Sequence, residues 1–219
     1  MKNLLYLFIA IGLLSGCKDD PDSIDDQPVD NIPTNVDTLV EVNTDHGSMI
    51  MYMYKGTPLH RANFHKLVGE GFYNGTEFHR IIPNFMIQGG DPNSKDDNRA
   101  NDGQGGPGYT IPAEIDTNKY MHDSGAVAAA RIGDTQNPER RSSGSQFYIV
   151  VSEPGTKHLN GAYTVFGKVI QGLETAQTIV TQRRQSSNNL PITRIPMTMK
   201  FIIKTPEEIF TEYGFQVED

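Results

Sequence analysis

Apolar and polar residues alternate in short segments along most of this 219-residue chain, which is the pattern of half-buried β-strands. Residues 39–44 and 49–54 alternate in this way, and the Asp45-His46-Gly47 run between them is typical of a hairpin turn. Six more segments have the length and composition of strands: residues 77–82, 85–88, 126–130, 146–151, 163–169 and 196–204. Many short strands joined by glycine-rich turns favour a barrel, because closure removes exposed sheet edges.

Two segments have the spacing of amphipathic helices. Thr57 and Pro58 are typical of a helix N-cap and first position, and apolar residues then recur at helical spacing as far as the glycines at 69–71. A second apolar face follows Gly172 in residues 173–182. In the C-terminal extension, residues 205–219, the Thr205-Pro206-Glu207-Glu208 run predicts a capping box that starts a short terminal helix.

The first 16 residues have the features of a secretory signal. A basic start is followed by eleven uncharged residues at 4–14, fewer than the ~20 that a membrane-spanning helix needs. Leu14-Ser15-Gly16-Cys17 resembles a bacterial lipobox, in which the signal is cut before a cysteine that then carries acyl chains. We therefore expect lipidation at Cys17 and membrane attachment in the envelope of a Gram-negative-type bacterium, with an ordinary signal peptide as the alternative.

Residues 17–38 are expected to be an acidic tether. Positions 18–38 carry one Lys against seven Asp, whereas the whole chain has a net charge of −8, so most of the acidity lies in this segment. The run after Cys17 resembles a surface-export signal of some lipoproteins, although a solvated linker is the favoured interpretation. The net acidity argues against nucleic-acid binding, and the single Cys excludes an intramolecular disulfide or a thiolate zinc site.

The segment from Phe78 to Asp91, FHRIIPNFMIQGGD, resembles the signature of the cyclophilin family of peptidyl-prolyl isomerases. Other parts of the family pattern follow in order, and they lie at residues 105–109, 144–149, 159–161 and 163–169. The resemblance covers residues 39–204. It implies a closed eight-stranded antiparallel β-barrel capped by two α-helices, which acts without a cofactor on proline-containing polypeptides and which we expect to be monomeric.

The chemistry of X–Pro isomerisation explains which residues such a site needs. Twisting the amide breaks its resonance and leaves a lone pair on the prolyl nitrogen, so a hydrogen-bond donor near that nitrogen and an apolar slot for the ring suffice. Arg80 fits the donor, and the resemblance adds Phe85 and Gln88 as its catalytic neighbours. The residues that it implies in substrate binding are His79, Met86, Gln104, Gly105, Ala130, Arg131, Gln146, Tyr148, His158, Leu159 and Tyr163.

This chain departs from the family pattern at several places. His158 stands at the drug-contacting Trp position, which predicts weak binding of cyclosporin-type peptides, and Tyr148 replaces the common Phe, which we expect to add a hydroxyl to the pocket rim. His79 is as easily structural as substrate-binding. Two long polar loops, residues 92–103 and 132–143, are expected to flank one side pocket and to change substrate choice there.

Two other interpretations follow from the same residues. The aspartates of the 92–103 loop invite a calcium site, but their order fails the EF-hand pattern, so we predict no metal. A binding module that holds proline-containing partners without turnover is the alternative to an enzyme. The intact set of Arg80, Phe85 and Gln88 favours the enzyme, because a scaffold would be free to lose the arginine.

Overall fold

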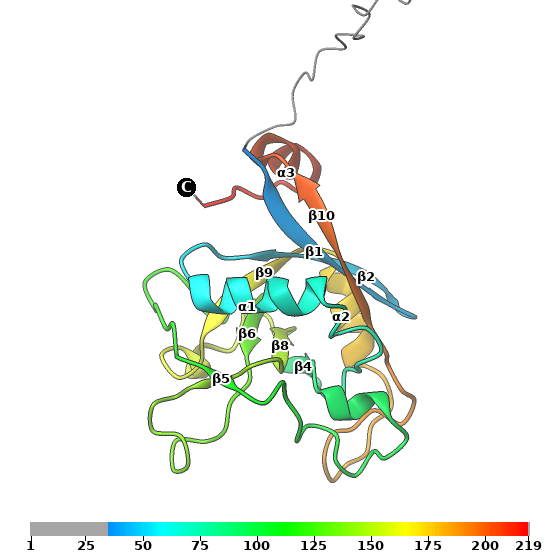
Figure 1. Ribbon diagram of the computed structural model, residues 1–219. Helices are drawn as coiled ribbons and strands as arrows, with labels where there is room; N and C mark the ends of the chain where they lie inside the picture. The colour runs from blue at the N-terminus through cyan, green and yellow to red at the C-terminus, as the bar shows by residue number, and fades with distance from the viewer. Residues whose placement is uncertain (1–34, 219) are drawn as a thin grey trace, which may run out of the picture. The chain divides into compact units, whose positions relative to one another are not determined.

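The computed structural model describes residues 35–218, so the predicted signal, Cys17 and most of the predicted tether lie outside the described residues. The described part is mainly β with three α-helices (Figure 1). The strands of the main sheet are β1 (Asp37–Thr44), β2 (Gly47–Met53), β3 (Arg80–Ile82), β4 (Met86–Gly89), β6 (Ala126–Ala129), β8 (Phe147–Val150), β9 (Val165–Gln171) and β10 (Thr198–Lys204). Each matches one of the eight predicted segments.

The predicted closed barrel is wrong. The eight strands form one antiparallel sheet in the order β10-β1-β2-β9-β6-β8-β4-β3, and β10 and β3 do not pair with each other. The segments that precede these edge strands meet only at an isolated bridge between Glu77 and Pro196, with flanking backbone bonds such as Phe78 N to Ile195 O (3.0 Å). The bond from Phe78 N, together with that from Met197 N to Thr76 O (2.8 Å), flanks the bridge, and the pairing does not continue into β3 and β10.

The helices are α1 (Pro58–Gly69), α2 (Leu173–Val180) and α3 (Pro206–Tyr213), beside two single-turn 3-10 helices, η1 (Pro92–Lys95) and η2 (Lys157–Leu159). Thr57 is the N-cap of α1 as predicted, but its hydroxyl donates to the Tyr54 carbonyl instead of capping the helix. The distant Glu114 carboxylate takes that role, since it accepts the backbone N–H groups of Leu59 and His60, both at 2.9 Å.

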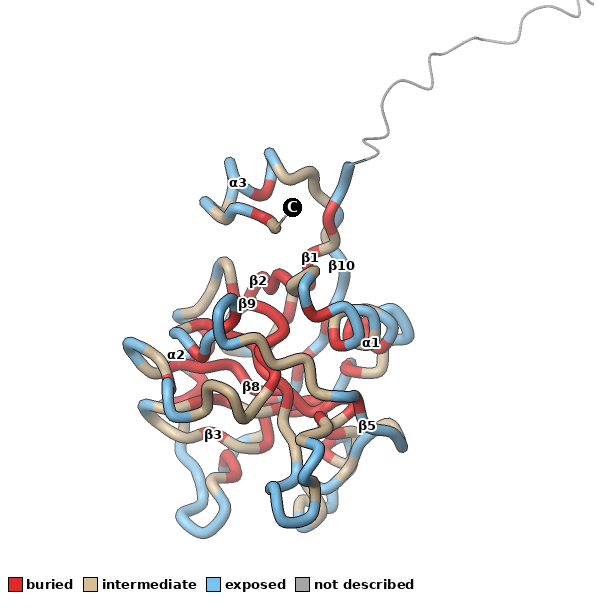
Figure 2. The backbone as a smooth tube through the Cα atoms, turned by 90° about the vertical axis from the view of Figure 1, so that its left-hand side faces the viewer, coloured by how far each residue is buried: buried red, intermediate tan, exposed pale blue. Residues whose placement is uncertain are grey.

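The sheet buries apolar side chains on both faces. Its inner face packs against α1 and α2 in a cluster that includes Phe64, Ile87 and Phe147. The outer face of β4, β6, β8 and β9 carries a second, smaller cluster around Met86, Tyr148 and neighbouring aromatic residues. In Figure 2 the buried backbone follows the central strands and the exposed backbone follows the loops. Alternation along each strand therefore supplies two different apolar surfaces.

The C-terminal extension packs onto the body. The predicted capping box is confirmed, since the Thr205 hydroxyl accepts from Glu208 N (3.2 Å) and the Glu208 carboxylate accepts from Thr205 N (2.7 Å). Ile209 is fully buried, and it forms a third apolar cluster with Leu39, Tyr52 and others at one end of the sheet. Figure 1 shows α3 beside β10 and β1.

The predicted tether ends earlier than expected. Asp37 and Thr38 already belong to β1, and the Asp37 carboxylate is buried between Arg61 Nη2 at 2.6 Å and Lys55 Nζ at 3.3 Å. An aspartate that looks like part of an acidic linker is thus paired with two cations of the body. Within residues 35–218 no helix combines the length and apolarity that crossing a bilayer requires.

Candidate active site

One row of side chains crosses the outer face of the sheet, and strand register explains it. Arg80 pairs with Gln88 across β3 and β4, Gln88 pairs with Tyr148 across β4 and β8, and Tyr148 pairs with Ala128 across β8 and β6. Residues directly opposite each other in neighbouring strands share a face. The sequence positions 80, 88 and 148 therefore converge, as the resemblance implied.

A directed chain of hydrogen bonds holds the arginine. The Gln146 amide donates to the carbonyls of Gly103 (3.0 Å) and Gly105 (2.8 Å), so its oxygen is left to accept from Gln88 Nε2 at 3.0 Å. Gln88 Oε1 then accepts from Arg80 Nη1 at 3.2 Å. This series of hydrogen bonds uses one of the five N–H groups of the Arg80 guanidinium and leaves others for a ligand.

Burial affects the charge state of the groups around this chain. The Arg80 side chain is half-buried, and desolvation lowers its pKa from the ordinary value, but a guanidinium stays protonated in proteins. Burial also lowers the pKa of His79, which keeps its imidazole neutral at pH 7. Arg80, unlike His79, is therefore a donor of fixed charge at this site.

The loop at residues 103–105, called the glycine loop below, accepts the hydrogen bonds of Gln146. Asp91 fixes this loop. The buried Asp91 carboxylate accepts backbone N–H groups from Asn93 (2.8 Å), Gly103 and Gly105 (3.2 Å). Any side chain at Gly105 would overlap that carboxylate, which accounts for a glycine at this position. Asp91 thus sets the position of the two carbonyls to which Gln146 donates.

Beside Arg80 lies a cavity of about 190 Å³ with both apolar and polar side chains in its wall. Its lining brings together most of the predicted residues: Arg80, Phe85, Met86, Gln88, Ala130, Arg131, Tyr148, Leu159 and Tyr163. His158 does not line the cavity but is exposed and stacks on Phe85 with ring centroids 5.8 Å apart. His79 is buried behind the row and faces Gly103 rather than the cavity.

Of the two predicted substrate-binding residues Ala130 and Arg131, only Arg131 has main-chain groups available to a peptide. Ala130 already uses both of its main-chain groups, because its N–H donates to Gln146 O (3.0 Å) and its carbonyl accepts from Ser143 N (2.8 Å). The main-chain groups of Arg131 have no partner within the described residues. The Arg131 side chain is itself fixed, since Nε donates to Ala162 O at 2.7 Å and the guanidinium lies 4.5 Å from the Tyr163 ring centroid. Arg131 is therefore the edge residue that could pair with a bound backbone.

The Tyr148 hydroxyl is not at the pocket rim, which corrects the sequence prediction. It lies 2.9 Å from Nε2 of the buried His122, whose Nδ1 lies 2.9 Å from Asn160 Oδ1. The amide oxygen also accepts the His122 backbone N–H (2.9 Å), so Nδ1 carries the ring proton and Nε2 accepts from the tyrosine. Burial lowers the pKa of His122, in keeping with this neutral form.

The contacts of His122 with Tyr148 and with Asn160 connect two parts of the site. Tyr148 forms the floor of the cavity from β8, and Asn160 directly follows η2, which carries the cavity wall residue Leu159. Sequence reasoning gave Asn160 no role, although residues 159–161 belong to the family pattern. It missed His122, because His122 lies in a segment without strand or helix periodicity and no motif marks it. The signal for His122 was the Tyr at position 148, where Phe is common.

We predict that Tyr148→Phe lowers stability but not activity. The phenylalanine keeps the cavity surface and leaves Nε2 of His122 without a donor, which costs about 1–2 kcal/mol of unfolding free energy. The value of kcat/KM for a proline peptide should change by less than about threefold, because the hydroxyl faces away from the cavity. Urea unfolding and a cis–trans assay measure the two effects.

The matched control is Tyr163→Phe, which removes a hydroxyl from the other, half-buried tyrosine of the cavity. Its stability should stay within about 0.5 kcal/mol of the native protein. A large loss of kcat/KM in Tyr148→Phe with unchanged stability would contradict this interpretation, because it would place the hydroxyl in the reaction.

The two long loops do not flank one place. The 132–143 loop lines a side pocket of about 780 Å³ next to the cavity through Ile132, Asn137 and Arg141, together with Gln104 and Gly105 of the glycine loop. From the 92–103 loop only Gly103 reaches this pocket. Arg99, Ala100 and Asp102 of that loop instead line a second cavity of about 330 Å³, which shares Gln88, Gly103 and Gln104 with the side pocket.

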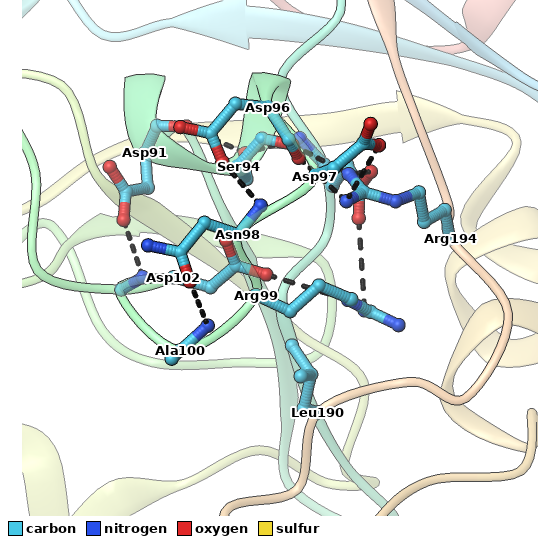
Figure 3. A network of polar contacts seen from close by, with 12 residues as sticks. Asp91, Ser94, Asp96, Asp97, Asn98, Arg99, Ala100, Asp102, Leu190 and Arg194 are labelled. Carbon is cyan, nitrogen blue, oxygen red and sulfur yellow. Dashed lines mark hydrogen bonds and ion pairs between the residues drawn. The ribbon is translucent and has the colours of Figure 1, made fainter.

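The aspartates of the 92–103 loop, and Asp91 just before it, contact groups of the protein itself. Asp97 lies 3.7 Å from Arg194 Nη2 and Asp102 lies 3.7 Å from Arg99 Nε (Figure 3). Asp91 binds backbone N–H groups, and Asp96 accepts from Asn98 N at 2.7 Å. Within residues 35–218 no three His, Cys, Asp or Glu side chains are arranged to hold a metal ion.

Comparison with known proteins connects this geometry to a family. Residues 39–199 match the family model described as "Cyclophilin type peptidyl-prolyl cis-trans isomerase/CLD". The chain is 48% identical over 118 residues to peptidyl-prolyl cis-trans isomerase B of Bacillus subtilis. The aligned region covers 54% of this chain and 72% of that protein. It is 37% identical to a peptidyl-prolyl cis-trans isomerase of Synechococcus elongatus, over 66% of this chain and 94% of the relative.

Solved structures show the same fold. A cyclophilin-type peptidyl-prolyl cis-trans isomerase of Cryptosporidium parvum superposes with a TM-score of 0.66 at 29% identity, over 75% of this chain and 97% of that one. A structure of that protein in the presence of the dipeptide Ala-Pro gives a TM-score of 0.64 at 29% identity, over 76% of this chain and 99% of that one.

Proposed function

This chain belongs to the cyclophilin-type family of peptidyl-prolyl cis-trans isomerases, and we propose that it isomerises X–Pro bonds of exported proteins with Arg80 as the residue that stabilises the twisted bond. The observation that carries the Arg80 assignment is the series of hydrogen bonds from Gly103 and Gly105 through Gln146 and Gln88. It holds the guanidinium beside a cavity that contains the apolar side chains of Phe85, Met86 and Leu159.

The reaction needs no bond to be broken. Amide resonance sets a barrier of about 18–20 kcal/mol to rotation, and the twisted state has a pyramidal prolyl nitrogen with a localised lone pair. An N–H group of Arg80 that donates to this lone pair stabilises the twisted state and not the planar ones. An acceleration of 10⁵-fold requires roughly 7 kcal/mol of such preference, so the donor must act where water does not compete.

The cavity supplies the second requirement. Phe85, Met86 and Leu159 give an apolar slot that holds the proline ring while the preceding carbonyl rotates. The free main-chain groups of Arg131 are positioned to pair with the peptide on one side of the bond. A neutral His79 behind the row has no proton-transfer step to perform, since the reaction moves no proton.

The exported context rests on residues 1–17 alone. A lipidated Cys17 followed by the acidic segment up to residue 36 would attach the catalytic body to a membrane in the cell envelope. Incorporation of a labelled fatty acid into the native protein and its absence from Cys17→Ala would support this attachment. Equal labelling of both proteins would refute it.

A cis–trans assay on proline peptides with residues 35–219 tests the proposed function. We expect kcat/KM well above the uncatalysed rate, together with weak, reversible peptide binding. Peptide binding without acceleration would contradict the enzyme and favour a module that only binds proline-containing partners. Neither binding nor acceleration would contradict both.

A further inference from the structure

The side pocket of about 780 Å³ adjoins the proline cavity, and the two share Gln88, Ala130 and Arg131 in their walls. Arg131 is also the edge residue whose main-chain groups have no partner among the described residues. A peptide that pairs with this edge while its proline lies in the cavity therefore passes the side pocket within a few residues of the proline. The side chains around the side pocket act on the residues that flank the proline.

The wall of the side pocket carries positive charge and no carboxylate. Of the described residues that line it, the charged ones are Arg131 and Arg141. The charge of Arg131 is balanced, because its Nη1 lies 2.6 Å from Asp134 Oδ1. For Arg141 the carboxylate in reach within residues 35–218 is that of Glu139, at 4.0 Å, and the Glu139 side chain is 75% exposed. Such an exposed, distant pair contributes little, so the Arg141 charge remains available to a ligand.

Arg141 is held in a fixed position by two neighbours. Its Nε donates to the Thr110 hydroxyl at 2.8 Å, and its Nη2 donates to the Thr110 carbonyl at 2.9 Å. The Asn137 amide brackets its backbone, since Oδ1 accepts from Arg141 N (3.0 Å) and Nδ2 donates to Arg141 O (2.8 Å). Thr110 belongs to β5 (Thr110–Ile111), which pairs with β7 (Ser142–Ser143) directly after Arg141. A ligand therefore binds without the entropic cost of ordering this side chain.

One terminal nitrogen of Arg141 is left for a ligand. Nη1 has no hydrogen-bond partner within residues 35–218, and it is open to solvent, unlike the buried polar atoms that lack partners. A carboxylate is the side-chain group that accepts most strongly from a guanidinium, and an ammonium would be repelled. The Asp91 carboxylate behind the glycine loop does not reverse this preference, because it is buried and accepts three backbone N–H groups.

We propose that the side pocket selects substrates that carry a glutamate or aspartate near the proline, and that Arg141 is the residue that selects them. The proposal rests on the proposed isomerase function and adds a charge preference to it. It gives the 132–143 loop a role in substrate choice through one positioned cation.

A set of matched peptides tests this preference in the native protein. Glutamate and glutamine have the same shape and differ in charge, so each is placed in turn at the three positions before and after the proline, alongside lysine. A protease-free cis–trans assay gives kcat/KM for each peptide. We expect one position at which glutamate is favoured over glutamine by about three- to tenfold and lysine is the poorest. Raising NaCl from about 0.05 to 1 M should bring the ratio close to one, because salt screens a solvent-exposed charge.

Three variants then test the named residue. Arg141→Gln should abolish the preference for glutamate and leave kcat/KM for the glutamine peptide within about twofold. Arg141→Lys keeps the charge but not the paired bonds to Thr110, so it should retain a preference of at least about twofold, which a purely structural role of the arginine would not. Arg140→Gln is the matched control, because the Arg140 guanidinium donates to Gly161 O (2.6 Å) and does not line the side pocket. It should leave the ratio unchanged within about twofold.

Failure of the charge preference and failure of the isomerase give different results. Equal kcat/KM for glutamate and glutamine at every position, or a preference for lysine, would overturn the acidic subsite while leaving the isomerase intact. A preference for glutamate that survives Arg141→Gln, or that Arg140→Gln removes equally, would overturn the assignment to Arg141. No acceleration of any peptide would instead contradict the proposed function, and the subsite with it.

Discussion

Replacing Arg80 with alanine should lower kcat/KM for a proline peptide by about 10²- to 10³-fold, the loss typical when one preorganised donor to a transition state is removed. The apolar slot remains, so the affinity for the same peptide should change by less than about fivefold. Because the guanidinium is only half-buried and makes one hydrogen bond, to Gln88, the unfolding free energy should change by less than about 1 kcal/mol. The signature is therefore a loss of rate without loss of binding or fold.

The pH dependence separates this mechanism from proton transfer. Arg80 stays protonated, and burial lowers the pKa of His79, so neither group changes charge between about pH 7 and 9. The value of kcat/KM should be flat across that range in the native protein. A sloping profile that Arg80→Ala removes would contradict a donor of fixed charge.

Two variants serve as controls for the arginine. Arg80→Lys keeps the positive charge but not the planar fork that both bonds Gln88 and reaches the peptide, so it should recover only a small part of the rate. Arg183→Ala removes an exposed arginine and should leave rate and stability unchanged. Equal kcat/KM for the native protein and Arg80→Ala would remove Arg80 from the mechanism.

The positions of the strands could be predicted because each buries one or two faces and so shows its period in the sequence. Closure of the sheet could not, because it depends on whether two edges meet in register. The two edges meet only around the bridge between Glu77 and Pro196, and no local pattern in the sequence shows that these two residues lie opposite each other. The capping box at Thr205 was predictable because it is local.

The site was predictable where it follows strand register and not where it depends on side-chain direction. Alternation assigns Tyr148 to the outer face, but it does not say whether the hydroxyl points into the cavity or past it. That direction depends on His122, which lies 26 positions away in sequence and outside any strand. The ion pairs of Arg99 with Glu77 and Asp102 likewise depend on how an irregular loop folds back, which no periodicity records.

For the C-terminal extension, too, the sequence predicts the local structure but not the packing. Its sequence predicts a capped helix, but the surface against which that helix packs is set by contacts far along the chain. The Glu218 carboxylate accepts from Lys55 N and from the Tyr120 hydroxyl, both at 2.5 Å, and the Phe215 ring lies 5.0 Å from that of Tyr52. The extension therefore closes one end of the sheet and is part of the folded body.

Ile209→Ala should consequently destabilise the whole body by about 2–4 kcal/mol, the usual cost of truncating a fully buried isoleucine. Phe210→Ala is the matched control, because its side chain is 56% exposed on the same helix, and it should cost less than about 0.5 kcal/mol. Urea unfolding of both variants, monitored at two probes, measures the difference. At low denaturant kcat/KM should be unchanged in both, since α3 does not contact the proline cavity. Equal stabilities for the two variants would show that the extension is an appendage whose burial contributes nothing to the fold.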